Sequence, residues 1–173
     1  MSLHYLLDGC NIASQLPLPE KESQQDERLL LLRLITLSRP QGSPNNQLTA
    51  VFDGHSKAIS QMTFEGMSVV FSGDISADDK IREMIESSNH KRNFVVVSDD
   101  KAVQFAARQL GSRVMPAFEF VAKLKIPSDL KRITKMRSKE GKSKDISNVL
   151  EHKITAEFEG IWLRPKDKGN KTV

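Results

Sequence analysis

The segment Phe94-Val95-Val96-Val97-Ser98-Asp99 decides the fold class of this chain. Four apolar residues follow one another without a polar interruption, and the run stops at a Ser-Asp pair. An unbroken run of this kind is typical of a strand in a parallel sheet that is covered on both faces. We therefore expect the chain to be built around such a sheet.

Segments of the same character lie on both sides of Phe94–Val97. The predicted strands are residues 4–7, 48–52, 67–71, 94–97 and 113–115. Helical spacing of apolar residues, together with capping residues, predicts helices over residues 28–38, 76–89, 101–110 and 117–124. Strands that alternate with helices predict an α/β fold, with an open parallel sheet of about five strands and helices on both faces.

Charge is divided unevenly along the chain. Residues 1–120 carry 12 Lys and Arg against 15 Asp and Glu, a net charge of −3, whereas residues 121–173 carry 14 against 7, a net charge of +7. We therefore expect one domain over residues 1–125 and a basic C-terminal extension, partly helical or disordered, over residues 126–173. A basic block of this size fits contact with a polyanion, and it equally fits a solvated tail.

Composition excludes several classes of protein. No apolar stretch approaches the roughly 18 residues of a membrane span, so we expect no membrane partner. The single cysteine, Cys10, excludes an intramolecular disulfide and a zinc site built from cysteines. These features predict a cytoplasmic protein.

Acidic residues stand at the ends of most predicted strands. Asp8 follows the first strand, Asp53 the second, Asp74 and Asp78 the third, and Asp99 the fourth. Ligands of open α/β sheets bind beyond the carboxyl ends of the strands, where the strand order reverses. Carboxylates gathered there repel one another unless a cation lies between them, and an oxygen-rich site suits Mg²⁺ or Mn²⁺. The pattern predicts a divalent-metal site at this edge.

Helical spacing assigns different roles to two neighbouring acids. Asp78 precedes Ile81 and Ile85 by three and seven residues, which places it on the helix face that is turned to the core. Asp79 lies on the solvent side. Because Asp79 stands three residues after Ser76, we interpret the two as a capping box.

The same spacing separates the acids that precede the next helix. Asp99 lines up with Val103 on the apolar face, whereas Asp100 lines up with Gln104 on the polar face. Asp99 is therefore the candidate ligand and Asp100 the candidate helix cap. Ser98, directly before them, is a further candidate for the site.

Several other residues near the strand ends have two interpretations each. Asp8 is a metal ligand or the cap of the following turn, and Asp53 is a supporting acid or a turn residue. Asn11 either serves the site, by orienting a phosphate or holding the Asp8 carboxylate, or stabilises the turn. Glu119, after the fifth strand, is a further acid for the same cleft, whereas Asp74 is interpreted as a turn residue.

Aromatic residues contribute mainly to the predicted core. We expect Phe118 and Phe120 to be buried there. Trp162, in the basic extension, is instead a candidate for stacking on nucleic-acid bases.

Four motifs occur in a fixed order along residues 4–124. They are Leu7-Asp8-Gly9-Cys10-Asn11, Val51-Phe52-Asp53-Gly54, Ala77-Asp78-Asp79-Lys80-Ile81 and Val97-Ser98-Asp99. In this order they resemble the YacP-like branch of the NYN domains, which belong to the PIN-like nuclease superfamily. Glu119-Phe120 is also similar to a Glu-Phe pair that often follows the last strand. The chain departs from the family pattern at Cys10, where Tyr is common.

The resemblance implies a Rossmann-like PIN/NYN fold and the activity of a metal-dependent endoribonuclease. It implies Asp8, Asp78 and Asp99 as metal-binding carboxylates, with Asn11 beside them and Asp53 as a supporting acid. Cys10 leaves this carboxylate set and the amide intact.

The implied reaction follows from the ligand set. Mg²⁺ or Mn²⁺ held by the carboxylates polarises the scissile phosphate and activates a water for in-line attack, which leaves 5′-phosphate and 3′-hydroxyl ends. The expected substrate is messenger or ribosome-associated RNA, so the ribosome is a possible partner. The basic residues expected to contact its phosphates are Lys131, Arg132, Lys135, Arg137 and Lys139.

Two other functions stay open. A non-catalytic RNA-binding module with the same fold would carry the same pattern. A phosphatase of the haloacid-dehalogenase type also has an Asp after its first strand, but that class needs a second Asp two residues later. Cys10 occupies that position here, which disfavours the phosphatase.

Overall fold

The computed structural model describes residues 2–16, 24–56, 59 and 62–127. Within these residues five strands form one parallel sheet in the order β3-β2-β1-β4-β5. The strands are β1 (His4–Asp8), β2 (Gln47–Phe52), β3 (Ser68–Phe71), β4 (Phe94–Val97) and β5 (Arg113–Met115). The predicted α/β class and its open, Rossmann-like parallel sheet are confirmed.

Both faces of the central strands are buried. All four residues of β4 are buried, and so are the last four residues of β1. Successive side chains of a strand point to opposite faces, so Leu7 and Val97 pack in one hydrophobic core and Leu6 and Val96 in another. Burial on both faces is the reason that β4 has an unbroken apolar sequence.

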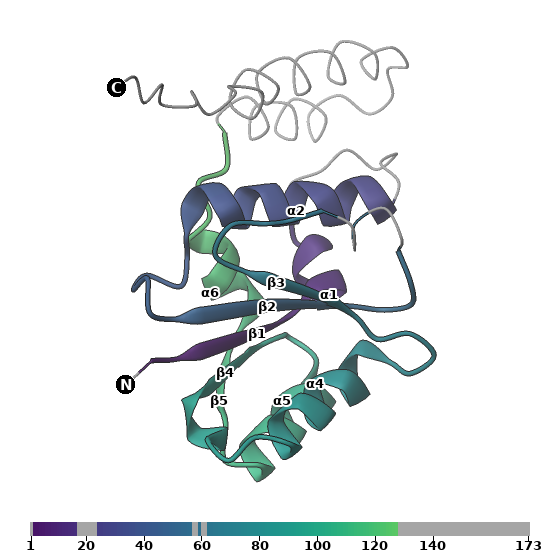
Figure 1. The fold of residues 1–173 in the computed structure, drawn as a ribbon, viewed down its shortest axis with the longest axis vertical. Coiled ribbons are helices and arrows are strands. Elements are labelled where there is room, and N and C mark those ends of the chain that lie inside the picture. The colour runs from purple at the N-terminus through teal and green to yellow at the C-terminus, as the bar shows by residue number, and fades with distance from the viewer. Residues whose placement is uncertain (1, 17–23, 57–58, 60–61, 128–173) are drawn as a thin grey trace, which may run out of the picture. The chain divides into compact units, whose positions relative to one another are not determined.

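Helices cover the two faces unequally (Figure 1). The helices α1 (Gly9–Ala13), α2 (Gln24–Ser38) and α6 (Ala117–Ala122) pack on one face, and α4 (Ala77–Glu86) and α5 (Lys101–Gln109) pack on the other. A 3₁₀ turn, η1 (Lys91–Asn93), leads into β4. The predicted helices correspond to α2, α4, α5 and α6, with ends that differ by a few residues. Helix α1 was not predicted, because five residues are too few to show a helical period.

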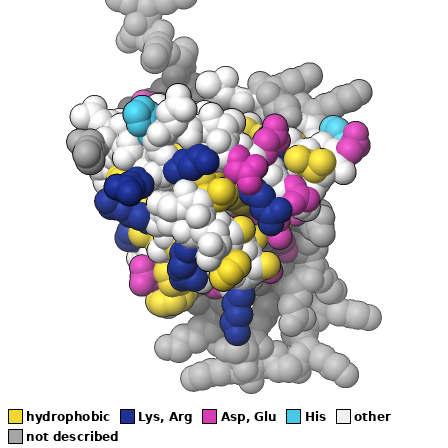
Figure 2. All heavy atoms as spheres, turned by 90° about the horizontal axis from the view of Figure 1, so that it is seen from below, with side chains coloured by type: hydrophobic (Ala, Val, Ile, Leu, Met, Phe, Trp, Pro, Cys, Tyr) yellow, Lys and Arg dark blue, Asp and Glu magenta, His cyan; other side chains and the backbone are white. Residues whose placement is uncertain are grey.

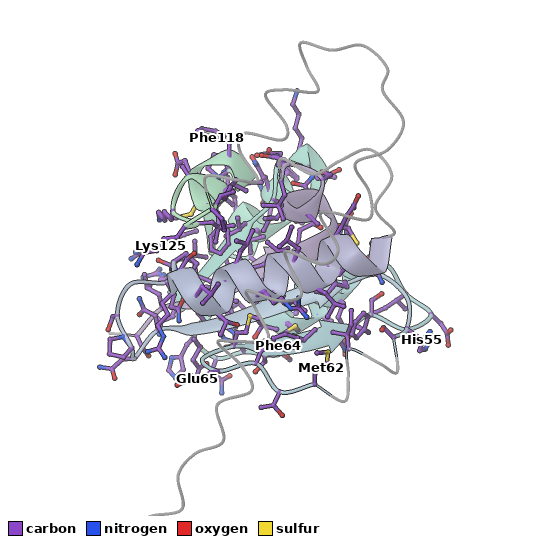
Figure 3. The ribbon with its side chains drawn as sticks, turned by 90° about the horizontal axis from the view of Figure 1, so that it is seen from above. His55, Met62, Phe64, Glu65, Phe118 and Lys125 are labelled. Carbon is purple, nitrogen blue, oxygen red and sulfur yellow. The ribbon has the colours of Figure 1, made fainter. Side chains whose placement is uncertain are left out.

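The two phenylalanines of α6 have opposite environments. Phe120 is fully buried, as expected, whereas Phe118 is 62% exposed, so the prediction that it lies in the core is wrong. Ala117 and Phe120, three residues apart, form the core-facing side of this short helix, and Phe118 therefore projects away from it. Figure 3 shows Phe118 on the side of α6 that is turned away from α2.

The strand order reverses between β1 and β4. The chain runs outward from β1 through β2 to β3, and it then returns to the other side of β1 to add β4 and β5. At such a reversal the connections leave in opposite directions, which opens a crevice beyond the carboxyl ends of the two central strands. Asp8 ends β1 at this point, and Ser98 directly follows β4.

The chain divides into two compact units, Met1–Lys135 and Met136–Val173. The first contains the sheet. The predicted extension lies almost wholly outside the described residues, and with it Trp162 and the five basic residues that were expected to contact phosphates. The boundary at residue 125 stays a prediction. None of the helices in the described part of the chain is long and apolar enough to cross a membrane.

Candidate active site at the carboxyl ends of β1 and β4

Asp8 is a buried carboxylate at the end of β1, with 6% of its surface exposed. Oδ1 accepts a hydrogen bond of 3.1 Å from the Asn11 backbone N–H, and Oδ2 accepts one of 2.8 Å from the Ser98 hydroxyl. Burial raises the pKa of Asp8 although both hydrogen bonds act to lower it, and the charges of Asp53 and Asp100 raise it further. Asp8 therefore caps α1 and is held in one orientation at the end of β1.

Ser98 joins the two central strand ends. Its side chain is fully buried, and its hydroxyl donates to Asp8 while its oxygen accepts a 3.0 Å hydrogen bond from the Asp100 backbone N–H. The hydroxyl therefore orients the Asp8 carboxylate and ties it to the loop after β4. Ser98, one of the predicted site residues, acts here as a positioning residue.

Gly9 makes the tight turn after Asp8 possible. A Cβ atom at this position would lie 2.3 Å from the Phe52 ring, closer than any real Cβ contact. Glycine therefore lets α1 begin directly against β2, immediately after the strand. This approach places the Asn11 backbone N–H where it reaches Asp8.

Asp78 lies in the first turn of α4 and faces the same edge of the sheet. Burial raises its pKa, and the charges of Asp8, Asp100 and Asp53 add to the shift in that order. No hydrogen bond reaches its carboxylate from the described residues. Ile81 and Ile85 on the same helix face are buried, but Asp78 is exposed because it stands at the end of this face, beyond the strands.

Asp79 has the structural role that its spacing predicts. The Ser76 hydroxyl accepts a 3.0 Å hydrogen bond from the Asp79 backbone N–H and donates one of 2.8 Å to its carboxylate. Arg82 lies 3.8 Å from the same side chain. The Ser76 cap is confirmed, but the Asp79 carboxylate binds the Ser76 hydroxyl and not the Ser76 backbone N–H, so only half of the predicted capping box forms.

Asp53 and Asp99 occupy equivalent places on the two halves of the sheet. Asp53 follows β2 and accepts a 2.8 Å hydrogen bond from Ala77, the first residue of α4. Asp99 follows β4 and accepts a 2.8 Å hydrogen bond from Ala117, the first residue of α6. Each acid therefore fixes the helix that follows the neighbouring strand. The second oxygen of Asp53 has no partner within the described chain, whereas that of Asp99 accepts a hydrogen bond from the Gln15 amide.

Asp100 caps α5 and also adds negative charge near Asp8 and Asp78, whereas the helical spacing predicted only the cap. Oδ1 accepts hydrogen bonds of 2.7 and 3.1 Å from the Ala102 and Val103 backbone N–H groups, which confirms the predicted helix cap. Its charge also raises the pKa values of Asp8 and Asp78. Spacing could not reveal this second role, because Asp100 is in an extended conformation and does not follow the helical period.

Asn11 holds the site together from α1. Its side-chain oxygen accepts a 3.0 Å hydrogen bond from the Asp99 backbone N–H, while its own backbone N–H binds Asp8. The backbone of Asn11 therefore holds the Asp8 carboxylate, whereas its side chain stabilises the loop after β4. Asp74 and Glu119 are exposed, and neither makes a hydrogen bond or ion pair with the acids around Asp8 in the described part of the chain.

The acids fit a hard divalent cation by their chemistry. As the side chains stand, the described residues include no group of three His, Cys, Asp or Glu that could enclose a metal ion. Nevertheless, Mg²⁺ usually keeps several waters and needs only one or two carboxylates from the protein. Asp8 and Asp78 are two such carboxylates with raised pKa values, and a cation between them would relieve their repulsion.

Charge is also segregated on the outer surface. Figure 2 looks onto the face that is covered by α4 and α5. Acidic side chains lie mainly toward the carboxyl ends of the strands, and basic side chains lie mainly toward the opposite side. The acidic edge is therefore a feature of the surface as well as of the crevice.

Comparisons with known proteins agree with this architecture. Two crystal structures of Rae1 (YacP) from Bacillus subtilis have a similar fold at 21% sequence identity. The first covers 93% of this chain and 91% of Rae1 with a TM-score of 0.60. The second, a single-residue variant, covers 84% and 87% with a TM-score of 0.57. No curated protein matches the chain in sequence.

A family model gives the assignment. The model of the YacP-like NYN domain matches residues 5–162, which extends the resemblance of the four motifs into the basic extension. The strand order, the acids at the strand ends and this match agree with one another. The chain belongs to the YacP-like NYN domain family, a family of PIN-like nucleases.

Proposed function

We propose that this protein is a metal-dependent endoribonuclease whose reaction centre lies between Asp8 and Asp78. The observation that carries the proposal is the gathering of acids at the reversal of strand order, where Asp8 is buried and fixed by two hydrogen bonds and the charges of Asp8, Asp53 and Asp100 act on Asp78. Capping α1 needs a side-chain oxygen at position 8 but not a carboxylate whose charge is repelled by neighbouring acids. Such an arrangement is typical of a site that binds a cation or a proton during a reaction.

The residues of the proposed centre have distinct tasks. Asp8 is held in one orientation by Asn11 and Ser98. The Asp78 carboxylate is exposed and accepts no hydrogen bond from the described residues, which leaves its oxygens available to a cation. We propose that the third carboxylate comes from the pair Asp99 and Asp100, with Asp53 as a supporting acid. When bound, Mg²⁺ or Mn²⁺ supplies a Lewis acid for the scissile phosphate and lowers the pKa of a bound water.

The proposed substrate is RNA, in messenger or ribosome-associated form, and the expected products carry 5′-phosphate and 3′-hydroxyl ends. Membership of a nuclease family supports RNA as the substrate class. The basic residues of the extension, from Lys131 to Lys139, are proposed to bind RNA phosphates without sequence preference.

The test is cleavage of a labelled single-stranded RNA by the full chain. We expect cleavage with Mn²⁺ or Mg²⁺ and none with a chelator. The Asp8→Asn variant is expected to bind RNA but not to cut it, and Asp74→Asn, which removes an exposed acid from a neighbouring loop, is expected to cut normally. If the wild-type protein binds RNA but cuts it neither with Mn²⁺ nor with Mg²⁺, the nuclease proposal is wrong and the protein is a non-catalytic RNA-binding module.

A further inference from the structure

We propose that Arg28 binds a phosphate of the RNA backbone next to the acidic centre and so positions the strand for cleavage. The inference rests on the proposed nuclease function and adds a residue that none of the four motifs contains. Three observations carry it: the place of the guanidinium, the surface that holds it, and the donors that it leaves open.

The guanidinium of Arg28 lies at the same edge of the sheet as Asp8. Arg28 belongs to α2, and its Nη2 donates to the Asp53 carbonyl oxygen at 3.3 Å and to the Cys10 sulfur at 3.7 Å. Asp53 directly follows β2, and Cys10 is two residues beyond Asp8. The positively charged guanidinium therefore contacts a residue that is only two positions after Asp8 in the chain.

Two aromatic rings hold the guanidinium in place. Its central carbon lies 5.5 Å from the centroid of the Phe52 ring and 6.0 Å from that of the Phe71 ring, which are favourable distances for cation–π attraction. The two rings stack on each other with centroids 5.8 Å apart. Phe52 in turn packs against Gly9, so the platform under Arg28 is continuous with the turn that positions Asp8.

Arg28 keeps donors available for an anion. A guanidinium has five N–H groups in a planar fork, and both hydrogen bonds that Arg28 makes to described residues start from Nη2. The ion pairs of the described chain join Arg39 to Glu65, Lys80 to Glu83 and Arg82 to Asp79. Arg28 therefore has no carboxylate partner among the described residues, although it contacts the backbone of Asp53.

A phosphate is the anion that this arrangement suits best. The carboxylates at this edge repel an RNA strand, and a fixed cation beside them offsets that repulsion for one phosphate group. The fork of arginine matches two phosphate oxygens at once. Contact with the sulfur and a carbonyl oxygen orients the fork without neutralising it.

The test measures RNA affinity as a function of salt, without divalent metal. Arg28→Met keeps an apolar stem on the two rings and removes the charge. We expect it to weaken binding about tenfold. The slope of log affinity against log salt should fall by the amount that a single phosphate contact contributes. Arg28→Lys retains the charge and should keep the slope while binding less tightly than wild type. Arg39→Met, which removes an exposed arginine just past the other end of α2, is the matched control and should change neither quantity.

The outcomes separate this inference from the function on which it rests. If Arg28→Met binds RNA with the wild-type affinity and slope, Arg28 has only a structural role and the inference is overturned. If Arg28→Met fails to fold, Arg28→Lys decides, because unchanged affinity there contradicts a bidentate contact. A wild type that never cleaves RNA overturns the nuclease, whereas normal cleavage with unaffected Arg28 variants overturns this inference alone.

Discussion

At the scale of single residues, the raised pKa values of Asp8 and Asp78 make the stability of the protein depend on pH. A carboxyl whose pKa is higher in the folded than in the unfolded protein binds more protons when folded. The stability of the protein therefore falls as the pH rises from the ordinary Asp range through the raised pKa values, and the loss persists at higher pH. A cation at the site would reverse this loss.

Removal of the Asp78 charge should therefore stabilise the protein at neutral pH. We expect Asp78→Asn to raise the melting temperature at pH 7 without divalent metal, and to have no such effect below about pH 3, where the carboxyls are protonated. Mg²⁺ should raise the melting temperature of wild type more than that of the variant. Asp74→Asn serves as the control, and an equal response of all three proteins to Mg²⁺ would show that Asp78 is not near a bound cation.

Ser98 makes a second prediction possible at this scale. Ser98→Ala removes the hydroxyl that donates to Asp8, so the pKa of Asp8 should rise further. Mn²⁺ binding, measured by calorimetry, should then require a higher pH, and stability should fall by about 1–2 kcal/mol. Ser72→Ala removes another buried hydroxyl, which donates to the Ile75 carbonyl oxygen, and should lower stability without moving the pH dependence. A pH dependence that is unchanged in Ser98→Ala would contradict the role given to this hydroxyl.

At the scale of elements, the strand ends and helix starts are built from the same acids. Asp53, Asp99 and Asp100 each accept backbone N–H groups at the start of a helix. Their positions at the strand ends were predictable, because parallel strands bring their carboxyl ends to one edge. Their individual orientations were not, since residues in the extended link between strand and helix follow neither period.

A comparison of Asp99→Asn with Asp100→Asn identifies the third carboxylate. Asparagine keeps an oxygen for the backbone N–H groups that each acid binds, so both variants should melt close to wild type. The variant that removes the third carboxylate should lose cleavage by about 100-fold or more. Full activity in both variants would contradict a ligand from this pair.

The turn after β1 makes a prediction about stability alone. Gly9→Ala would push a methyl group into the Phe52 ring, and we expect it to cost about 1–3 kcal/mol in chemical denaturation. In a double-mutant cycle with Phe52→Leu, the smaller side chain should recover part of this loss. Additive losses would show that the contact between Gly9 and Phe52 does not limit packing.

At the scale of the whole molecule, the fold class was predictable and the strand order was not. The unbroken run of β4 and the alternation of elements suffice for a parallel sheet with two covered faces. The order β3-β2-β1-β4-β5 depends on the side of β1 to which the chain returns. No local sequence pattern predicts that side. The burial of Phe118 was predicted wrongly because α6 has only six residues. Ala117 and Phe120 alone form its buried face, and Phe118 lies outside that face.

The charge of the extension should appear in RNA binding by the full chain. Replacing Lys131, Arg132 and Lys135 together by Gln should weaken binding and reduce the salt slope by about two, since each phosphate contact on a single strand contributes roughly 0.7. The same three substitutions should leave the melting temperature unchanged. A salt slope equal to that of wild type would show that these residues do not touch RNA.

The most direct test of the metal-dependent centre is a crystal of the full chain soaked in Mn²⁺ and measured at a wavelength where manganese scatters anomalously. We predict an anomalous peak between the carboxylates of Asp8 and Asp78, at about 2.2 Å from an oxygen of each. The peak should be lost in Asp8→Asn. A wild-type map with no peak within coordination distance of these two side chains would contradict the account.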